Sequence, residues 1–254
     1  MLPRGAKAAI LAAMFALLIK EVRGTLSSLV GIITLVVFLL ITGLFLWVFP
    51  NNVLDLQFAD LDLLFYYAPW IFLFLIPALT MRIFAEEKRT GTMELLLTRP
   101  ISELQIVLAK YLAVVFLILL ALLPTLFYYF SIIELGDPPG NIDRGGTWGS
   151  YIGLLLLAGG FAAIGTFASS ITSNQVVSFI VAVVFCFFTF IGFELIGSFE
   201  TFGALQSTIL RLGMQEHYIA LSRGVLDSRD ILYFIGCVAL FITFSWAAIR
   251  SRKW

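Results

Sequence analysis

The chain alternates long apolar runs with short charged segments, and the lengths of the runs predict its architecture. A helix needs about 20 mainly apolar residues to cross the hydrocarbon core of a bilayer. Six charge-free stretches are long enough once the run from Gly145 to Phe193 is divided at the polar cluster from Ser169 to Gln175. All six are predicted to be helices, because an open strand cannot satisfy its backbone hydrogen bonds in lipid. The predicted spans cover about residues 26–49, 63–82, 108–133, 150–170, 175–197 and 230–250.

Two further apolar stretches are too short to cross a bilayer. Ala8 to Ile19 is flanked by basic residues and predicts a helix over residues 4–24 that lies at the membrane surface. A signal peptide is the alternative, but no small-residue cleavage site follows. Thr201 to Leu210, within the outer segment 198–229, predicts a re-entrant element that is buried against protein rather than lipid. The sequence thus predicts a single all-α integral membrane domain over residues 1–254.

The composition supports membrane insertion and argues against several other classes of protein. Hydrophobic residues make up 61% of the chain and charged residues 13%, whereas a soluble domain carries about 25% charged residues. The net charge of zero argues against a nucleic-acid binder, which normally presents a basic face. Cys186 and Cys237 lie in apolar runs, where cysteine is usually a small hydrophobic residue. The single histidine, His217, excludes a histidine-based metal cluster, and the sequence contains no phosphate-binding loop.

The charges are segregated between the two sides of the predicted bundle. Twelve of the 16 basic residues precede the first span, lie between the second and third, or follow the sixth. Six spans place all these segments on one side, which is predicted to be cytoplasmic together with both termini, because basic residues accumulate in cytoplasmic loops. The opposite side has only four basic residues and collects ten acidic ones: Asp55, Asp60, Asp62, Glu134, Asp137, Asp143, Glu200, Glu216, Asp227 and Asp230.

The loop between the second and third spans, residues 83–102, is a candidate for partner binding. A dense charge run ends at Gly91, which is predicted to break the helix, and a short segment then exposes Met93 and Leu95 to Leu97. A solvated turn is the simpler interpretation. However, four apolar side chains in a polar loop form a hydrophobic patch, and such a patch favours binding of a partner protein.

Glu194 is an acidic residue inside a predicted span, near its outer end. An ionisable group inside a membrane span is often functional, and an ion-coupled carrier would use such a group to bind its coupling ion. A structural role in capping or pairing is the alternative, because the residue lies near the outer end of its span. Ion-coupled carriers also need inverted repeats and broken helices, and the sequence shows no internal repeat.

Several short motifs make the chain similar to permeases of the ABC-2 type. They are Met81-Arg82, Glu86-Glu87-Lys88, the run from Gly91 to Ser102, Lys110-Tyr111, and the run from Ser222 to Asp227 before the sixth span. More narrowly, the chain resembles the permease subunit of the gliding-motility-associated ABC transporter of Bacteroidota. That resemblance rests on Gly43 to Phe49, Ala68 to Trp70, Gly140 to Asp143 and Gly149 to Leu154. Ser28-Leu29 departs from the Ser-Pro that relatives often show at the start of the first span.

The resemblance implies that membrane transport and ATP hydrolysis are carried out by different subunits. Two permease copies, or this chain and a larger permease-like subunit, would pair in the inner membrane, and two cytoplasmic ATPase subunits would bind below them. ATP and magnesium would lie on the ATPase, so this chain would carry no cofactor and would not itself be an enzyme. The segment from Phe84 to Thr98 would be the coupling helix. Its docking residues would be Glu86, Glu87, Arg89, Gly91, Met93, Glu94, Leu95, Leu96 and Leu97.

The resemblance therefore favours the permease subunit of an ATP-driven exporter that acts in gliding motility. A membrane subunit that assembles a machine without moving substrate is the alternative. On the outer side the candidate functional residues are Glu194, Arg223 and Asp227. The apolar spans mildly favour a lipidic, polymeric or peptide cargo over a small ion.

Overall fold

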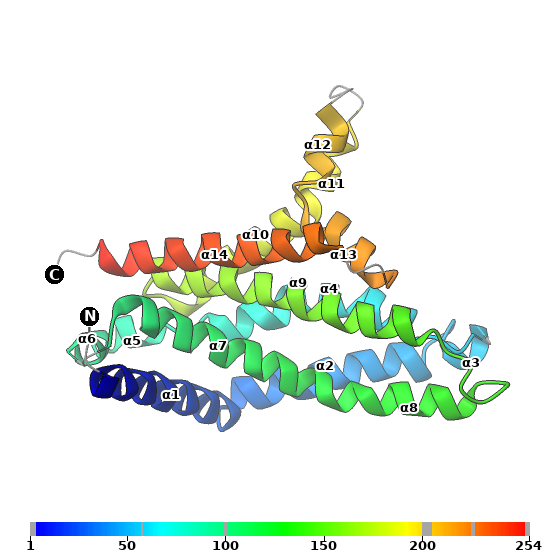
Figure 1. Cartoon of the computed structure of the whole chain (residues 1–254), viewed down its shortest axis with the longest axis horizontal. Helices are drawn as coiled ribbons and strands as arrows, with labels where there is room; N and C mark the ends of the chain where they lie inside the picture. Colours follow the sequence, from blue (N-terminus) through cyan, green and yellow to red (C-terminus); the bar gives the residue numbers. More distant parts are fainter. Residues whose placement is uncertain (1–3, 57, 99–100, 200–204, 225–226, 252–254) are drawn as a thin grey trace.

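The computed structural model describes residues 4–56, 58–98, 101–199, 205–224 and 227–251. Throughout these ranges the chain forms helices and no strand (Figure 1). Six helical segments within them are long and apolar enough to cross a membrane, which confirms the predicted all-α fold with six spans. They are α2 (Leu29–Trp47), α4 (Asp62–Thr80), α7 (Glu103–Leu122) with α8 (Leu126–Leu135), α9 (Arg144–Ile171), α10 (Gln175–Phe187) with α11 (Phe193–Gly197), and α14 (Ser228–Arg250).

The bundle is built around α9, which packs against α4, α7, α10, α13 (Met214–Ser222) and α14. Small residues allow these close contacts. A Cβ atom on Gly165 would lie 2.0 Å from the Thr80 hydroxyl oxygen of α4, and one on Gly149 would lie 2.8 Å from the Gly224 Cα atom. Larger residues would force these helices apart, so the sequence of α9 sets the spacing of the bundle.

Two of the spans contain turns that are not α-helical. The 3-10 turn η1 (Leu123–Thr125) joins α7 to α8 and contains Pro124, which cannot donate a backbone hydrogen bond. The π-helix η2 (Phe188–Gly192) joins α10 to α11. Such turns change the direction of a helix and occur often at functional sites.

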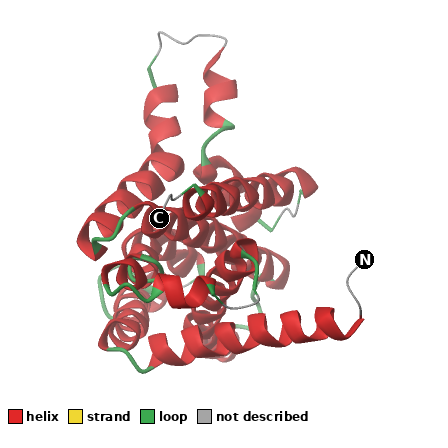
Figure 2. Ribbon diagram, turned by 90° about the vertical axis from the view of Figure 1, so that its left-hand side faces the viewer, coloured by secondary structure: helices red, strands yellow, loops and turns green. Residues whose placement is uncertain are grey.

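The first helix, α1 (Arg4–Leu26), runs largely across one end of the bundle rather than along it (Figure 2). Val22 of α1 is buried against Ala113 and Leu117 of α7. The chain then turns sharply, and the Ser28 hydroxyl caps α2 by accepting a hydrogen bond from the Gly31 amide at 3.1 Å. Ser28-Leu29 therefore provides a standard helix start without the proline that relatives often show.

The outer segment 198–229 differs from its prediction. Figures 1 and 2 show α11 and α12 (Gln206–Leu210) standing out from the bundle as a helical hairpin. No residue of α12 is buried, so the prediction that this stretch is buried against the rest of the chain is wrong for α12. Residues 201–204, the first part of the predicted re-entrant stretch, lie outside the described residues. In contrast, α13 is packed, with Met214, Tyr218 and Leu221 buried.

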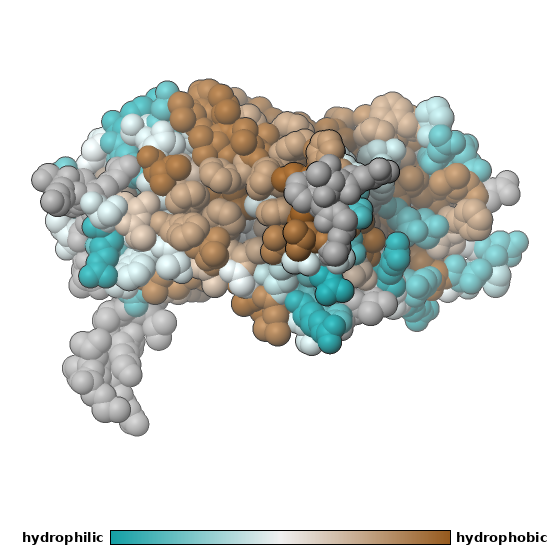
Figure 3. Space-filling view, turned by 90° about the horizontal axis from the view of Figure 1, so that it is seen from above, coloured by the Kyte–Doolittle hydropathy of each residue, from teal (hydrophilic) through white to brown (hydrophobic). Residues whose placement is uncertain are grey.

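The two ends of the bundle differ in composition. One end, here called the basic end, holds the start of α1, the end of α14, and the short helices α5 (Ala85–Arg89) and α6 (Met93–Leu97) (Figure 1). The other, the acidic end, holds α3 (Val53–Leu56) and the start of α9. Viewed from above, apolar residues fill the middle of the molecule and hydrophilic residues gather toward both ends (Figure 3).

Candidate functional site

A buried lysine joins three separate elements at the basic end. The side chain of Lys110, on α7, is 1% exposed, and its Nζ atom lies 3.0 Å from Glu21 Oε1 on α1 and 2.8 Å from Glu87 Oε1 on α5. The ammonium also donates to the Ile83 carbonyl at 3.0 Å, and its Nζ atom lies over the Phe84 ring, 5.3 Å from the ring centroid. A buried charge needs such partners, because removal from water costs several kcal/mol. We call this arrangement the Lys110 clasp.

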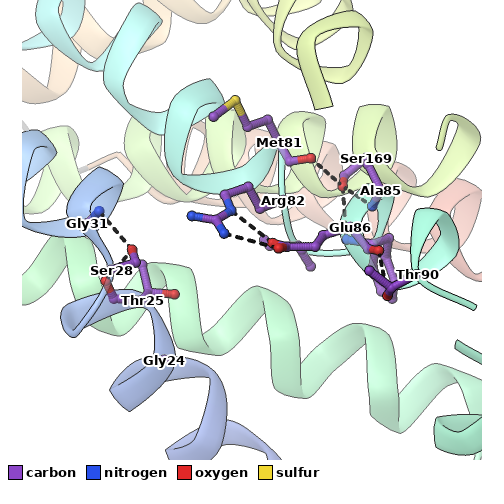
Figure 4. A network of polar contacts seen from close by, with 12 residues as sticks. Gly24, Thr25, Ser28, Gly31, Met81, Arg82, Ala85, Glu86, Thr90 and Ser169 are labelled. Atoms are coloured by element: carbon purple, nitrogen blue, oxygen red, sulfur yellow. Dashed lines mark hydrogen bonds and ion pairs between the residues drawn. The ribbon is translucent and has the colours of Figure 1, made fainter. Parts of the chain in front are cut away.

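The beginning of α5 is held by the end of α9. The Ser169 hydroxyl oxygen accepts hydrogen bonds from the amides of Phe84 at 3.0 Å and Ala85 at 3.1 Å (Figure 4). These are among the amides that a helix start leaves without an internal partner. Lys88 of α5 donates in turn to the Ser170 carbonyl. The position of α5 is thus set by α1, α7 and α9 together.

A cleft of about 380 Å³ lies between the end of α1 and α5, and we call it the basic-end cleft. On one side Arg82 pairs with Glu86 through two bonds, Nε to Oε2 at 2.9 Å and Nη2 to Oε1 at 3.1 Å. Figure 4 shows this pair facing Thr25 and Ser28 across the cleft. Glu87 also lines the cleft, and its buried Oε2 atom has no hydrogen-bond partner among the described residues. Charged side chains therefore line this cleft together with apolar ones.

Comparison with protein families shows which family the chain belongs to. The family model for ABC-2 family transporter proteins matches residues 57–249, about three quarters of the chain. The chain belongs to the ABC-2 transporter family. The match extends from α4 to α14 and includes α5, α6, Lys110 and Ser169, whereas Glu21 precedes it. No individual curated protein matches this permease.

Family membership defines the general role of the permease. It is a multi-pass membrane subunit of a transporter, and its described residues include six helices long and apolar enough to cross a membrane. ABC-2 permeases generally work with a cytoplasmic ABC ATPase and are generally non-catalytic. Among the described residues no group of histidine, cysteine, aspartate and glutamate side chains could hold a metal ion.

The segment that the sequence singled out for docking is divided between the core and the surface. Gly91 has a φ angle of +71° and separates α5 from α6, as predicted from the sequence. Met93 and Leu96 are 3% and 8% exposed, so the prediction that they form part of an exposed patch is wrong. They lie three residues apart on one face of α6, and that face is turned into the permease core. The side chain of Leu97 lies outside the described residues.

What remains open to a partner is the tip around Gly91. Leu95 is 69% exposed, and the neighbouring polar residues Arg89 and Glu94 are exposed as well. In contrast, Glu86 and Glu87 are engaged with Arg82 and Lys110. The tip of α5 and α6, meaning Arg89 to Thr92 with Glu94 and Leu95, is therefore the accessible part of the predicted docking segment. We call it the docking tip.

The predicted outer residues do not join this site. Glu194 is exposed on α11, and its side chain makes no hydrogen bond or ion pair with any described residue. Arg223 follows α13, and Asp227 caps α14 by accepting a hydrogen bond from the Arg229 amide at 2.9 Å. Pairing of Glu194 with the outer segment is thus not observed in the described part of the chain.

Sequence reasoning missed Glu21, Lys110 and Ser169 as site residues. A signal for Lys110 was present, because it falls inside the predicted span 108–133. An ionisable group within a span is costly unless it is paired or functional. Its partner Glu21 lies 89 residues earlier in the chain, and only the packing of α1 on α7 brings the two together.

Proposed function

We propose that this chain is the transmembrane permease subunit of an ATP-driven exporter and that its docking tip is seated on a separate ATPase subunit. The observation that carries the proposal is the contrast between the two parts of the α5–α6 segment. Its base is tied to three helices through the Lys110 clasp and Ser169, whereas its tip is exposed. A segment that transmits movement must be rigidly joined to the bundle at one side and open to the partner at the other.

The distribution of charge supports a cytoplasmic position for the basic end. Lys20, Arg82, Arg89 and Arg250 lie there on α1, beside α5 and on α14, together with the docking tip. Basic residues accumulate on the cytoplasmic side of membrane proteins. We therefore place both termini in the cytoplasm, α1 at the inner surface of the inner membrane, and ATP and magnesium on the ATPase.

The partners and the process follow from the resemblance to gliding-motility permeases. In this proposal the chain pairs with a second copy or with a larger permease-like subunit, and the complex moves substrate or performs mechanical work in gliding motility. The exposed apolar residues of α2 and α10, such as Val36 and Val184, are compatible with contact to either lipid or a second permease.

Leu95 provides the most direct test of this proposal. In the Leu95→Asp permease, we expect ATPase copurification to fall at least about tenfold, because a charge replaces an apolar contact at the docking surface. Folding should not change, since Leu95 is 69% exposed. The measurement is the amount of ATPase retained and its hydrolysis rate in the purified complex.

Leu212 offers a matched control at the other end of the bundle. It is 53% exposed in the turn between α12 and α13. Leu212→Asp should leave ATPase binding unchanged. Equal retention of the ATPase by the Leu95→Asp and unaltered permeases would show that the docking tip is not the contact.

A further inference from the structure

A second cleft, called here the acidic-end cleft, lies between α4 and α13 and has a volume of about 380 Å³. Asp62, Tyr66 and Trp70 of α4 form one wall, Gln215 and Tyr218 of α13 form another, and Arg223 follows α13. The volume lies within the range of small-ligand sites, about 300–1,000 Å³. None of the contacts at the basic end uses these residues.

The walls of this cleft are fixed by contacts behind it. The Tyr218 hydroxyl donates to the Phe65 carbonyl of α4 at 2.6 Å and so ties α13 to α4. Burial raises the pKa of Tyr218, so this hydroxyl keeps its proton at physiological pH. The rings of Trp70 and Phe190 of η2 pack nearly perpendicular to each other, with their centroids 6.0 Å apart. The cleft is therefore formed before any ligand arrives, which lowers the entropic cost of binding.

One part of the cleft suits a positively charged amine. The Asp62 carboxylate forms no ion pair with a described residue, and Asp60 and Asp143 add negative charge near it. Gln215 Oε1 is a buried hydrogen-bond acceptor with no partner among the described residues. Tyr66 and Trp70, which also line the cleft, are 65% and 42% exposed. An ammonium group offers three donors to such acceptors and is attracted to aromatic faces.

The rim of the cleft suits an anion. Arg223 is exposed, and no described carboxylate lies within 4.0 Å of its guanidinium. A guanidinium binds phosphate through paired hydrogen bonds. Asp62 and Arg223 line the same cleft without pairing with each other, so a ligand that carries both an amine and a phosphate complements both.

We propose that the acidic-end cleft binds a phosphoethanolamine-type zwitterion, with its ammonium held by Asp62, Gln215 and the Tyr66 and Trp70 rings and its phosphate at Arg223. The cleft opens beside a membrane-spanning helix, next to the exposed apolar residue Ile219. This position suits an aminophospholipid whose chains remain in the bilayer. The proposal does not depend on the ATPase or on the docking tip.

The test compares lipids that differ only in the headgroup. Dihexanoyl phosphatidylethanolamine and dihexanoyl phosphatidylglycerol are titrated onto the full-length permease in detergent, with calorimetric detection. We expect Asp62→Asn to weaken phosphatidylethanolamine binding about tenfold, as for loss of one charge-assisted hydrogen bond, and to leave phosphatidylglycerol binding unchanged. Arg223→Gln should weaken binding of both lipids.

Glu216→Gln is the matched control, because Glu216 is exposed on α13 and does not line the cleft. It should change neither affinity. A further experiment adds soluble O-phosphoethanolamine as a competitor. If it displaces the lipid, the free zwitterion is a sufficient ligand. If it does not, the natural ligand is the membrane lipid. Equal affinity for the two headgroups, or unchanged phosphatidylethanolamine binding by a folded Asp62→Asn permease, would overturn the proposal.

Discussion

At the scale of single residues, Lys110 has the largest structural consequence. Its ammonium is the common partner of Glu21 on α1 and Glu87 on α5. A buried charge contributes little net stability when it is paired, but its loss leaves the partners uncompensated. The clasp therefore specifies the relative positions of α1, α5 and α7 more than it stabilises the bundle.

We expect Lys110→Ala to lower the free energy of unfolding by about 2–3 kcal/mol, at or just below the lower end of the range for a broken buried pair. The cost is limited because the side chains of Glu21 and Glu87 remain 20% and 15% exposed to water. Denaturant titration of the purified permease measures the change, and hydrogen exchange in α5 should rise in parallel.

Lys20 is the control for this variant. Its side chain is 69% exposed, and its Nζ atom lies 3.9 Å from the same Glu21 oxygen. A surface pair of this kind contributes about 0–1 kcal/mol. If Lys110→Ala proves as mild as Lys20→Ala, the clasp has no organising role.

At the scale of elements, α13 shows how a short helix is held in place. Both ring nitrogens of His217 make hydrogen bonds, Nδ1 with Asp230 Oδ1 of α14 at 2.6 Å and Nε2 with the Arg211 carbonyl at 2.9 Å. Its ring stacks on the Tyr233 ring with the centroids 3.9 Å apart, and the Tyr233 hydroxyl donates to the Leu212 carbonyl at 2.6 Å. These contacts join the turn before α13 to the first turns of α14.

We expect His217→Phe to increase amide hydrogen exchange in residues 211–214, because it keeps an aromatic ring beside Tyr233 but removes both hydrogen bonds. The loss amounts to about 2 kcal/mol of local stability. Mass spectrometry of the exchanged protein locates the effect. Unchanged protection of this turn would mean that the other contacts of α13, including the Tyr218–Phe65 hydrogen bond and packing on α9, are enough to position it.

In α5 and α6 the residue pattern predicted the break between the helices but not which side chains are buried. Gly91 predicted the break between α5 and α6, because a left-handed backbone conformation favours glycine. The same pattern could not tell that Met93 and Leu96 turn inward while Leu95 stays outside. A five-residue helix has too few positions to define an apolar stripe, so only its docking on the bundle decides which face is covered.

At the scale of the whole molecule, the six spans found in the described part of the chain place the docking tip and the helix α13 at opposite ends of the bundle (Figure 1). Membrane-impermeant maleimide labelling tests the proposed orientation. In a permease whose Cys186 and Cys237 are replaced by alanine, Arg89→Cys should react only from the cytoplasmic side and Glu216→Cys only from the outside. Reaction of both from one side would contradict the six-span topology, and an exchange of sides would reverse the orientation.

The sequence by itself determined the all-α membrane fold, the six spans and the segregation of charge, because hydrophobic length and basic loops act locally along the chain. It also marked the α5–α6 segment as a candidate docking surface. Only the tertiary structure decided which part of that segment is exposed, joined Glu21 and Glu87 to Lys110, and turned α12 away from the bundle. These features depend on contacts between residues far apart in the chain, and no local pattern encodes such a pairing.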